Sequence, residues 1–254
     1  MTLFDSNATL PIAHRGASAY APENTLSAIR KAIELKVKHI EIDVHMTKDG
    51  EVVAIHDSSI DRTSNGEGEV KNHTLADLKK LDFGSWFSSK FAGEKIPTLK
   101  EILELTGNDS IVIIELKEGN TKYPGIEEKI VALVSELGLS KNVILKSFDY
   151  KLLNNFEKLA PEIERLYCTF GGTSWITLDN WLRFKDIFEG ANFQYLQVHR
   201  FFITKGLVQR AHSKGIKLVV WDVHDKASME AYKNIGFDFI ESNNPDFVLE
   251  LSKK

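Results

Sequence analysis

Short apolar runs alternate with amphipathic segments along almost the whole chain. The first run, Pro11–His14, is followed by apolar residues at helical spacing over Leu26–Leu35 and then by a second run at His39–Val44. An order of strand, helix and strand is the sequence form of a βαβ unit. The pattern therefore predicts an α/β fold built on a parallel sheet.

Further strands are expected downstream, and helical segments fit between most of them. The expected strands are Ile111–Leu116, Val143–Phe148, Arg165–Phe170, Tyr195–Val198, Lys217–Trp221 and Phe239–Ile240. The expected helices are Gly125–Leu137, Tyr150–Leu159, Thr204–Lys214 and Lys226–Ile235. With the first two strands this makes eight strand-helix units in 254 residues, which is typical of a TIM (β/α)8 barrel. We therefore expect a single TIM-barrel domain over residues 1–254, with its site at the carboxyl ends of the strands.

The alternation of strands and helices is interrupted once, because the segment after the second strand is far longer than a single helix needs. Approximately residues 46–105 are expected to form a small insertion. Asp49-Gly50 is a hairpin signal before the alternating segment Glu51–His56, and short helices are expected at Leu75–Leu81 and Thr98–Leu105. An excursion from the carboxyl end of the second strand would overhang the barrel mouth and form one wall of its pocket.

Composition narrows the choice of partners. The chain carries 36 acidic residues against 32 lysines and arginines, so neither nucleic-acid binding nor attraction to anionic membranes is expected. No stretch approaches the roughly 18 apolar residues of a membrane span, and residues 1–7 lack the features of a signal peptide. A cytoplasmic protein with no stable membrane association is expected. Because Cys168 is the only cysteine, any metal must sit on oxygen or imidazole ligands.

Three acidic residues interrupt otherwise apolar strands. Glu41 and Asp43 are two positions apart, so both leave the same face and can converge on one cation. The apolar residues beside them take the other face, toward the helices. An isolated pair of this kind is more often salt-bridged to Lys or Arg, but a barrel strand favours the metal interpretation. Glu115 repeats the situation, and burying it without a cation would be costly. These carboxylates predict a Mg²⁺ or Ca²⁺ site.

Basic and imidazole groups stand at the same strand ends. Arg15 offers a planar fork suited to phosphate oxygens, and Gly16 beside it lets backbone approach a ligand. Lys117 shares a face with the third carboxylate, so its ammonium could hold the same ligand or neutralise the acids. His14 and His56 fall at the carboxyl ends of expected strands and could divide general-base and general-acid work near neutral pH.

The remaining histidines and the aromatic residues have weaker assignments. Trp221, Trp86 and Phe87 are candidates for the substrate pocket, with core or loop packing as the alternative for each. The histidines expected at the surface or at helix edges are His39, His73 and His212. His45 is in phase with the carboxylates and could reach the rim, and the two expected near the mouth are His199 and His224.

The order of the motifs is more specific than any one of them. The motifs are His14-Arg15-Gly16, Pro22-Glu23-Asn24-Thr25, Glu41-Ile42-Asp43-Val44, Asp49-Gly50-x-x-Val53-x-x-His56-Asp57 and Glu115-Leu116-Lys117. In this order they resemble the bacterial-type, cytoplasmic members of the glycerophosphodiester phosphodiesterase family. The resemblance continues through Asp61-Arg62-Thr63, Gly66-x-Gly68, Gly84-Ser85-Trp86-Phe87 and Ile96-Pro97-Thr98-Leu99, and reaches Trp221.

The resemblance implies a TIM-barrel enzyme. Its members hydrolyse glycerophosphodiesters such as glycerophosphocholine and glycerophosphoethanolamine to sn-glycerol 3-phosphate and an alcohol with a divalent metal. The implied roles are metal ligands for Glu41, Asp43 and Glu115, an acid-base pair for His14 and His56, and phosphate binding for Arg15 and Lys117. The implied chemistry is attack by the glycerol 2-hydroxyl to give a cyclic phosphate that water then opens. The order in which the histidines act, the leaving alcohol, the native metal and the oligomeric state stay open.

Two departures from the family pattern lie at the expected mouth. Trp221-Asp222-Val223-His224 stands where the family often has Trp-Thr-Val-Asn, and Glu241-Ser242-Asn243-Asn244-Pro245 replaces a more usual Thr-Asp before the proline. Both leave the choice of substrate open.

Three other functions compete. One is a lyase or aldolase in which Lys117 forms a Schiff base. Another is a binding module that keeps a phosphate pocket without turnover, although binding alone does not require paired proton-transfer groups. The third is a phosphodiesterase of intact lipids, which the lack of an anchor or a basic amphipathic helix disfavours.

Overall fold

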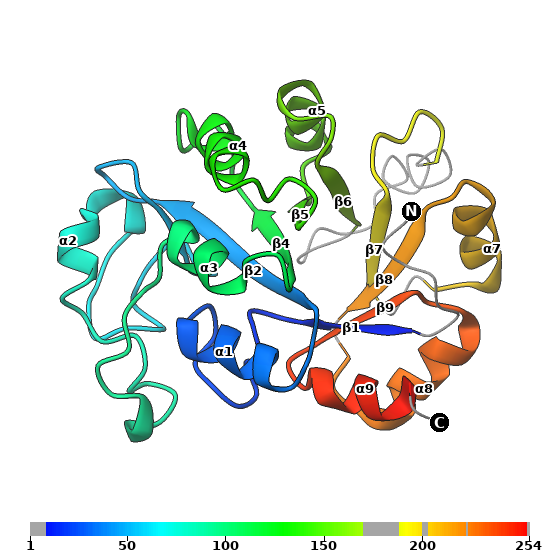
Figure 1. Cartoon of the computed structure of the whole chain (residues 1–254), viewed down its shortest axis with the longest axis horizontal. Helices are drawn as coiled ribbons and strands as arrows, with labels where there is room; N and C mark the ends of the chain where they lie inside the picture. The colour runs from blue at the N-terminus through cyan, green and yellow to red at the C-terminus, as the bar shows by residue number, and fades with distance from the viewer. Residues whose placement is uncertain (1–8, 170–187, 200–202, 222, 253–254) are drawn as a thin grey trace.

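Eight parallel strands close into a barrel in the computed structural model, which describes residues 9–169, 188–199, 203–221 and 223–252 (Figure 1). The barrel strands are β1 (Leu10–Ala13), β2 (His39–Met46), β4 (Ile111–Leu116), β5 (Val143–Ser147), β6 (Glu164–Thr169), β7 (Tyr195–His199), β8 (Lys217–Trp221) and β9 (Phe239–Ser242). Closure comes from β1, which pairs in parallel with β2 on one side and β9 on the other. The expected TIM barrel is confirmed. Phe170, expected to end the sixth strand, lies outside the described residues.

Helices between the strands cover the outside of the barrel (Figure 1). They are α1 (Leu26–Glu34), α3 (Leu99–Thr106), α4 (Ile126–Glu136), α5 (Tyr150–Leu159), α7 (Lys205–Ser213), α8 (Lys226–Ile235) and α9 (Pro245–Ser252). Side chains fix where several of them begin: the Thr25 hydroxyl accepts from the backbone N–H of Ala28, and Thr98 with Glu101 forms a reciprocal capping box.

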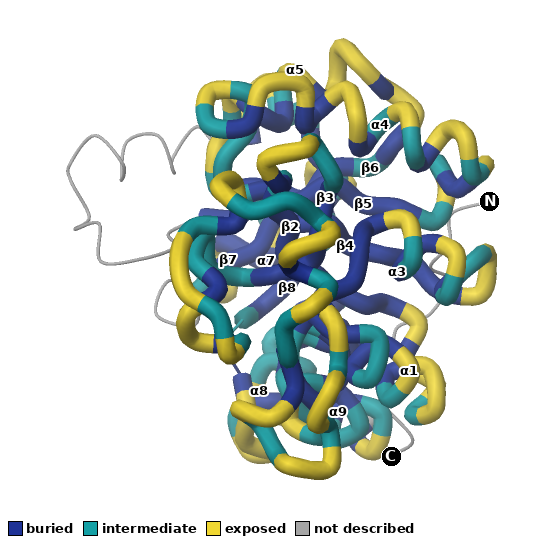
Figure 2. The backbone as a smooth tube through the Cα atoms, turned by 90° about the vertical axis from the view of Figure 1, so that its left-hand side faces the viewer, coloured by how far each residue is buried: buried dark blue, intermediate teal, exposed yellow. Residues whose placement is uncertain are grey.

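Alternate residues of each strand point to opposite sides of the barrel wall. On β2 the even-numbered residues 40, 42 and 44 pack outward in one apolar cluster with side chains of α1 and α3, as the alternation predicts. Inside, apolar side chains fill the lower layers of the barrel; they include Ile12, Ile113, Ile144, Leu166, Val219 and Phe239. Figure 2 shows the strands buried within helices that are partly exposed. Charged side chains take over from the apolar ones toward the carboxyl ends, where the candidate site lies.

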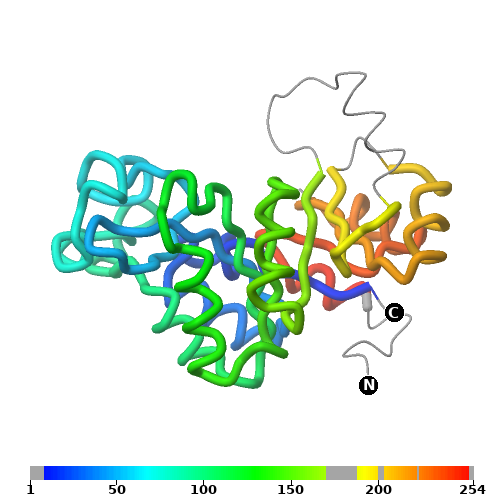
Figure 3. The backbone as a smooth tube through the Cα atoms, turned by 90° about the horizontal axis from the view of Figure 1, so that it is seen from above, coloured from blue at the N-terminus to red at the C-terminus, as the bar shows by residue number. Residues whose placement is uncertain are grey.

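The insertion after β2 has a small core of its own. It contains β3 (Val52–Ala54), which pairs antiparallel with the last residues of β2, followed by η1 (Val70–Asn72), α2 (Leu75–Leu78) and η2 (Ser89–Phe91). Its apolar cluster consists of Val53, Ile55, Ile60, Val70, Leu78, Phe83 and Ile96. The expected helix Thr98–Leu105 is α3, which packs on α1 and β4 and so serves as the barrel helix between β2 and β4. Figure 3 shows the insertion, in cyan, at one end of the molecule, away from α7 and α8.

His39 corrects one expectation, because it is not a surface residue. It opens β2 with 4% of its surface exposed, and its ring meets that of Phe239 edge-on at 5.0 Å between centroids. Its position has the same strand phase as Glu41, which turns the imidazole into the apolar floor of the barrel. His73 and His212 are half-buried and exposed, as expected.

No helix in the described part of the chain is long and apolar enough to cross a lipid bilayer. Residues 1–8, which include the segment that indicated a cytoplasmic protein, lie outside the described residues. The cytoplasmic location therefore stays a prediction.

Candidate active site

Three buried carboxylates meet inside the barrel at the carboxyl ends of β2 and β4. Asp43 and Glu115 are direct neighbours across the two strands, and Glu41 lies one inward position lower on β2. One carboxylate oxygen of each lies within 4.8 Å of the others, and all three side chains are at most 5% exposed. Such a set of oxygen donors fits a Mg²⁺ or Ca²⁺ ion. The structure thus brings together the acidic residues that the sequence singled out.

Two cationic side chains face these carboxylates from the open side. Lys117 Nζ lies 2.9 Å from Asp43 Oδ1 and 2.6 Å from Glu115 Oε1, and Arg15 Nε lies 3.4 Å from Asp43 Oδ2. Burial acts to raise the pKa of Asp43, but Lys117 and Arg15 outweigh it and hold that pKa well below its usual range. The same carboxylates raise the pKa of Lys117 despite its burial. Lys117 therefore stays an ammonium ion.

A tight turn after β1 aims Arg15 at the site. Arg15 and Gly16 both have positive φ, at 55° and 78°, and the Arg15 N–H donates to Glu41 Oε2 at 2.9 Å. A β-carbon on Gly16 would come within 2.7 Å of Ala28 on α1, so the turn requires glycine.

Lys146 is a charged residue of the site that sequence reasoning missed. It lies on β5 with its side chain 2% exposed, and its Nζ is 3.2 Å from Glu41 Oε1, 3.1 Å from Glu115 Oε2 and 3.0 Å from Glu241 Oε1. These three carboxylates raise the pKa of Lys146 well above its usual value although burial opposes them. A signal was present, because Lys146 follows Ile144 in the inward phase and interrupts an apolar run.

Each candidate catalytic histidine is held through Nδ1. His56 Nδ1 lies 2.6 Å from Asp57 Oδ1, while His14 Nδ1 lies 2.8 Å from Asn243 Oδ1 and its Nε2 lies 3.8 Å from Glu241 Oε1. Burial lowers the pKa of His56, and nearby cationic groups lower it further in spite of the Asp43 charge. The orientation of both rings is therefore fixed at Nδ1.

His45 supports this arrangement instead of reaching the rim. It is 2% exposed, its Nδ1 lies 2.8 Å from the Tyr123 hydroxyl, and its Nε2 lies 3.1 Å from the carbonyl oxygen of His56. The buried ring therefore ties the loop that carries His56 to the loop after β4.

The other residues of the motifs at 22–25 and 61–63 orient the charged groups. Glu23 Oε1 accepts from Arg15 at 2.9 Å and from Arg62 at 2.8 Å, and Arg62 Nε also donates to Asp57 at 2.7 Å. Asn24 donates to Asp43 Oδ2 at 2.9 Å. One hydrogen-bonded network thus joins the groups on β1, β2 and the insertion.

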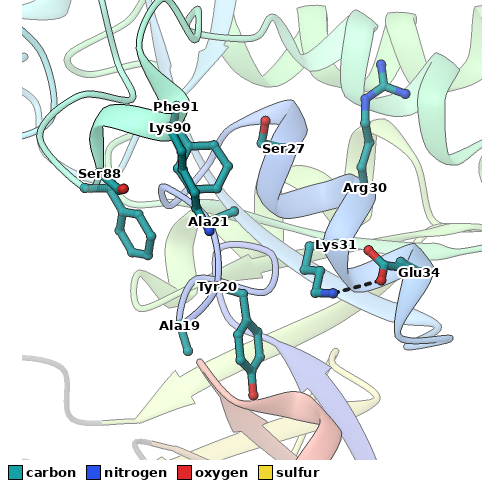
Figure 4. Close-up of a pocket in the computed structure, with 11 residues that line it drawn as sticks. Ala19, Tyr20, Ala21, Ser27, Arg30, Lys31, Glu34, Ser88, Lys90 and Phe91 are labelled. Carbon is teal, nitrogen blue, oxygen red and sulfur yellow. Dashed lines mark hydrogen bonds and ion pairs between the residues drawn. The ribbon is translucent and has the colours of Figure 1, made fainter.

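The aromatic candidates lie at different places. Trp86 is 40% exposed and lies 6.0 Å from the Arg62 guanidinium, next to the charged network. Phe87 lines a groove of 740 Å³ between α1 and the insertion. Tyr20 and Phe91, which line the same groove, are labelled in Figure 4.

Trp221 ends β8, where its ring packs against Phe148 and His199. Of the departures from the family pattern, Asp222 lies outside the described residues, and His224 is exposed.

A TIM barrel that gathers carboxylates, imidazoles and cationic side chains at the carboxyl ends of its strands has the architecture of a barrel enzyme. Comparison with known proteins defines which enzyme. The model of the glycerophosphoryl diester phosphodiesterase family matches residues 14–247. The chain belongs to this family, and it is a phosphodiesterase of glycerophosphodiesters.

Named relatives and a solved structure match this chain along nearly its full length. A glycerophosphodiester phosphodiesterase of Caldanaerobacter subterraneus is 41% identical over 251 residues, covering 97% of this chain and 98% of the relative. One from Bacillus subtilis is 34% identical, covering 99% and 89%. An Oleispira antarctica phosphodiesterase, solved with the product sn-glycerol-3-phosphate, has a TM-score of 0.82 at 30% identity, covering 97% of this chain and 98% of that one.

Proposed function

We propose that this enzyme hydrolyses glycerophosphocholine, glycerophosphoethanolamine and similar glycerophosphodiesters to sn-glycerol 3-phosphate and an alcohol, using Mg²⁺ or Ca²⁺. The observation that carries the proposal is the convergence of Glu41, Asp43 and Glu115 beside the cationic side chains of Arg15 and Lys117. The presence of sn-glycerol-3-phosphate in the related Oleispira antarctica structure supports the choice of product.

The three carboxylates would hold the divalent ion. When bound, such an ion polarises a phosphoryl oxygen and stabilises charge that develops on it. Arg15 and Lys117 are placed to bind the remaining phosphate oxygens, since both lie on the open side of the carboxylates. Glu23 holds the Arg15 guanidinium at 2.9 Å, which limits the entropy lost when a phosphate binds.

The partners of the two histidines favour different roles. His56 is placed to act as the general base, because its lowered pKa keeps it neutral and the Asp57 carboxylate stabilises the imidazolium that forms. It would take the proton of the glycerol 2-hydroxyl as this oxygen attacks phosphorus. We assign His14 the role of general acid toward the leaving alcohol, because the Glu241 carboxylate lies 3.8 Å from its Nε2 and Asn243 orients the ring through Nδ1. The roles reverse when water opens the cyclic phosphate.

The competing functions are less compatible with this geometry. A Schiff base needs a neutral lysine, whereas two carboxylates at 2.6 and 2.9 Å keep Lys117 charged. A binding module has no use for two histidines that each have a dedicated partner on Nδ1.

The deciding experiment measures release of glycerol 3-phosphate from glycerophosphoethanolamine and glycerophosphocholine. Each reaction is run with chelator alone and with Mg²⁺ or Ca²⁺ restored. Release that requires the metal supports the proposal and ranks the leaving groups. Folded protein that releases nothing under any metal contradicts it. A parallel reaction with phosphatidylcholine vesicles tests the alternative of an intact-lipid substrate.

A further inference from the structure

The groove between α1 and the insertion is separate from the active site. None of the proposed catalytic, metal-binding or phosphate-binding residues lines it, and its volume of 740 Å³ is that of a small-molecule pocket. Part of its lining is the segment 19–21, which follows the turn that carries Arg15. The Ala19 N–H donates to the carbonyl oxygen of Asn243 at 3.1 Å, so the groove begins at the rim of the barrel mouth.

Hydrogen bonds fix the two walls of the groove relative to each other. Ser27 on α1 donates from its backbone N–H and from its hydroxyl to the Glu94 carboxylate of the insertion, at 3.3 and 2.5 Å. Tyr20 is also held, because its hydroxyl donates to the Asp246 carboxylate on α9 at 2.9 Å. The groove is therefore preformed, which lowers the free energy that a ligand would spend on ordering it.

The groove is positively charged, although the whole chain has a net charge of -4. Three cationic side chains line it, Arg30, Lys31 and Lys90, against one carboxylate, Glu34. Lys31 Nζ lies 2.9 Å from Glu34 Oε1, so these two charges neutralise each other. Within the described part of the chain, the Arg30 guanidinium has no ion-pair partner and the Lys90 ammonium contacts only the Phe91 ring, at 4.7 Å. The two unpaired cations favour an anionic ligand.

The wall that the insertion supplies is aromatic. Phe87 and Phe91 meet edge-on, with 5.7 Å between ring centroids and 67° between ring planes. Since Lys90 also covers one face of Phe91, the rings do not offer two parallel faces for a planar base. They offer an apolar surface that suits an aliphatic chain. Figure 4 shows Lys90 and Phe91 on one side of the groove and Arg30 and Lys31 on the other.

We propose that this groove binds a single-chain amphiphile with a phosphate headgroup. Arg30 and Lys90 bind the phosphate oxygens, for which the planar fork of an arginine is well suited. The chain lies along Phe87 and Phe91, where burial of its methylene groups supplies the apolar part of the affinity. A phospholipid that has lost one of its two chains has this chemistry. The proposal does not depend on the metal or on the histidines of the active site.

The test uses dodecyl phosphate below its critical micelle concentration, because this phosphate monoester offers the enzyme no diester bond to cleave. Isothermal titration calorimetry is carried out with saturating glycerol 3-phosphate, which keeps the probe out of the active site. The wild-type protein is expected to bind dodecyl phosphate under these conditions. Inorganic phosphate lacks the chain and dodecyl maltoside lacks the charge, so neither should bind measurably.

Two variants change the two walls separately. Arg30→Glu reverses a charge and Phe91→Ser removes a ring, and each should weaken the binding of dodecyl phosphate by about tenfold or more. Lys205→Glu makes the same charge change at the exposed start of α7, away from the insertion, and should bind like the wild-type protein. Arg30→Glu should release glycerol 3-phosphate from glycerophosphodiesters at the wild-type rate. Arg30 is exposed, so this variant should fold even if Phe91→Ser does not.

Several results would overturn the proposal. Wild-type protein that does not bind dodecyl phosphate contradicts it, and so does binding that glycerol 3-phosphate abolishes, because the probe then occupies the active site. Unchanged affinity in Arg30→Glu would show that the probe binds elsewhere. Equally tight binding of adenosine monophosphate would identify a nucleotide site instead of an amphiphile site.

Discussion

His56 and Asp57 form a short imidazole-carboxylate pair, with 2.6 Å between His56 Nδ1 and Asp57 Oδ1. Consecutive residues seldom face each other, and here Arg62 holds the pair by donating to the second Asp57 oxygen at 2.7 Å. Burial acts to raise the pKa of Asp57, but its hydrogen bonds to Arg62 and His56 lower it to about 2. The carboxylate is thus ionised wherever the enzyme works and fixes the orientation of the imidazole.

Removing this carboxylate should slow the reaction without weakening substrate binding. We expect Asp57→Asn to lower kcat by about tenfold to 10²-fold, because the imidazolium at His56 loses its counter-charge. KM should change little. Steady-state kinetics measure both, with Asp109→Asn on the exposed surface as the matched control. A lowered kcat in the control, or an unchanged one in Asp57→Asn, would contradict the assigned role.

The histidines themselves should matter more. His14→Ala and His56→Ala are each expected to lower kcat by roughly 10²-fold or more, the usual scale for losing an acid-base group. Both side chains lie at loop ends and fill no part of the apolar clusters, so thermal unfolding should stay close to that of the wild-type protein. Wild-type turnover in either variant would refute the role of that histidine.

The orientation of His14 depends on Asn243, whose Oδ1 lies 2.8 Å from its ring. Asn243→Ala should lower kcat by about tenfold, because the imidazole is then free to rotate away from the leaving group. Asn243→Asp restores an acceptor at the same position and should recover most of the activity. Asn108→Ala, at an exposed loop, is the control. Loss that Asp does not rescue would indicate that the residue only supports the fold.

The proposed metal ligands can be tested without measuring turnover. Glu115→Gln should weaken Mg²⁺ or Ca²⁺ binding by about tenfold or more, since one anionic oxygen donor is lost. Isothermal titration calorimetry gives the dissociation constants. Glu136→Gln, at the exposed end of α4, removes the same charge from the protein and should leave binding unchanged. Equal affinities in the two variants would exclude Glu115 as a ligand.

His39 should make stability depend on pH. Burial, aided by Lys217 and Lys38, lowers the pKa of His39 to about 4 from 6.5. Because the folded value is the lower one, the unfolded chain takes up the proton first. The contribution of neutral His39 to the free energy of unfolding is therefore complete above pH 6.5 and is lost as the pH falls toward 4.

Urea unfolding can isolate this contribution. Between about pH 7.5 and about pH 5, the wild-type protein should lose about 2 kcal/mol more unfolding free energy than His39→Leu, which cannot titrate there. The comparison cancels the carboxylates that titrate in both proteins. Parallel curves for wild type and His39→Leu would show that the imidazole does not govern this loss.

Those features of the site that depend on local periodicity could be predicted from the sequence. Glu41 and Asp43 share a strand phase, so their inward direction and their meeting with Glu115 could be derived from two short segments. The same rule would have placed His39 inside, but its polar character favoured the surface. Whether an inward imidazole is buried depends on the side chains of its layer in the barrel, and distant strands supply those side chains.

Lys146 and Glu241 could not be predicted as a pair for the same reason. A lysine near a strand end is usually solvated, and only the closed barrel brings it to a carboxylate 95 residues away. The hydrogen-bond partners of the two catalytic candidates, His14 and His56, also differ in how far away they lie in the sequence. Asp57 is adjacent to His56 and visible in the motif, whereas Asn243 lies 229 residues from His14.

The closure of the barrel through β1 also determines when the active site can form during synthesis of the chain. The first strand made by the ribosome must wait for the last, because β9 supplies both its sheet neighbour and Asn243. Until then the nascent chain has its acidic residues and His14, but neither the partner that orients this ring nor the carboxylate that balances Lys146. Cleavage of glycerophosphodiesters is thus expected to begin only after synthesis has passed the final strand.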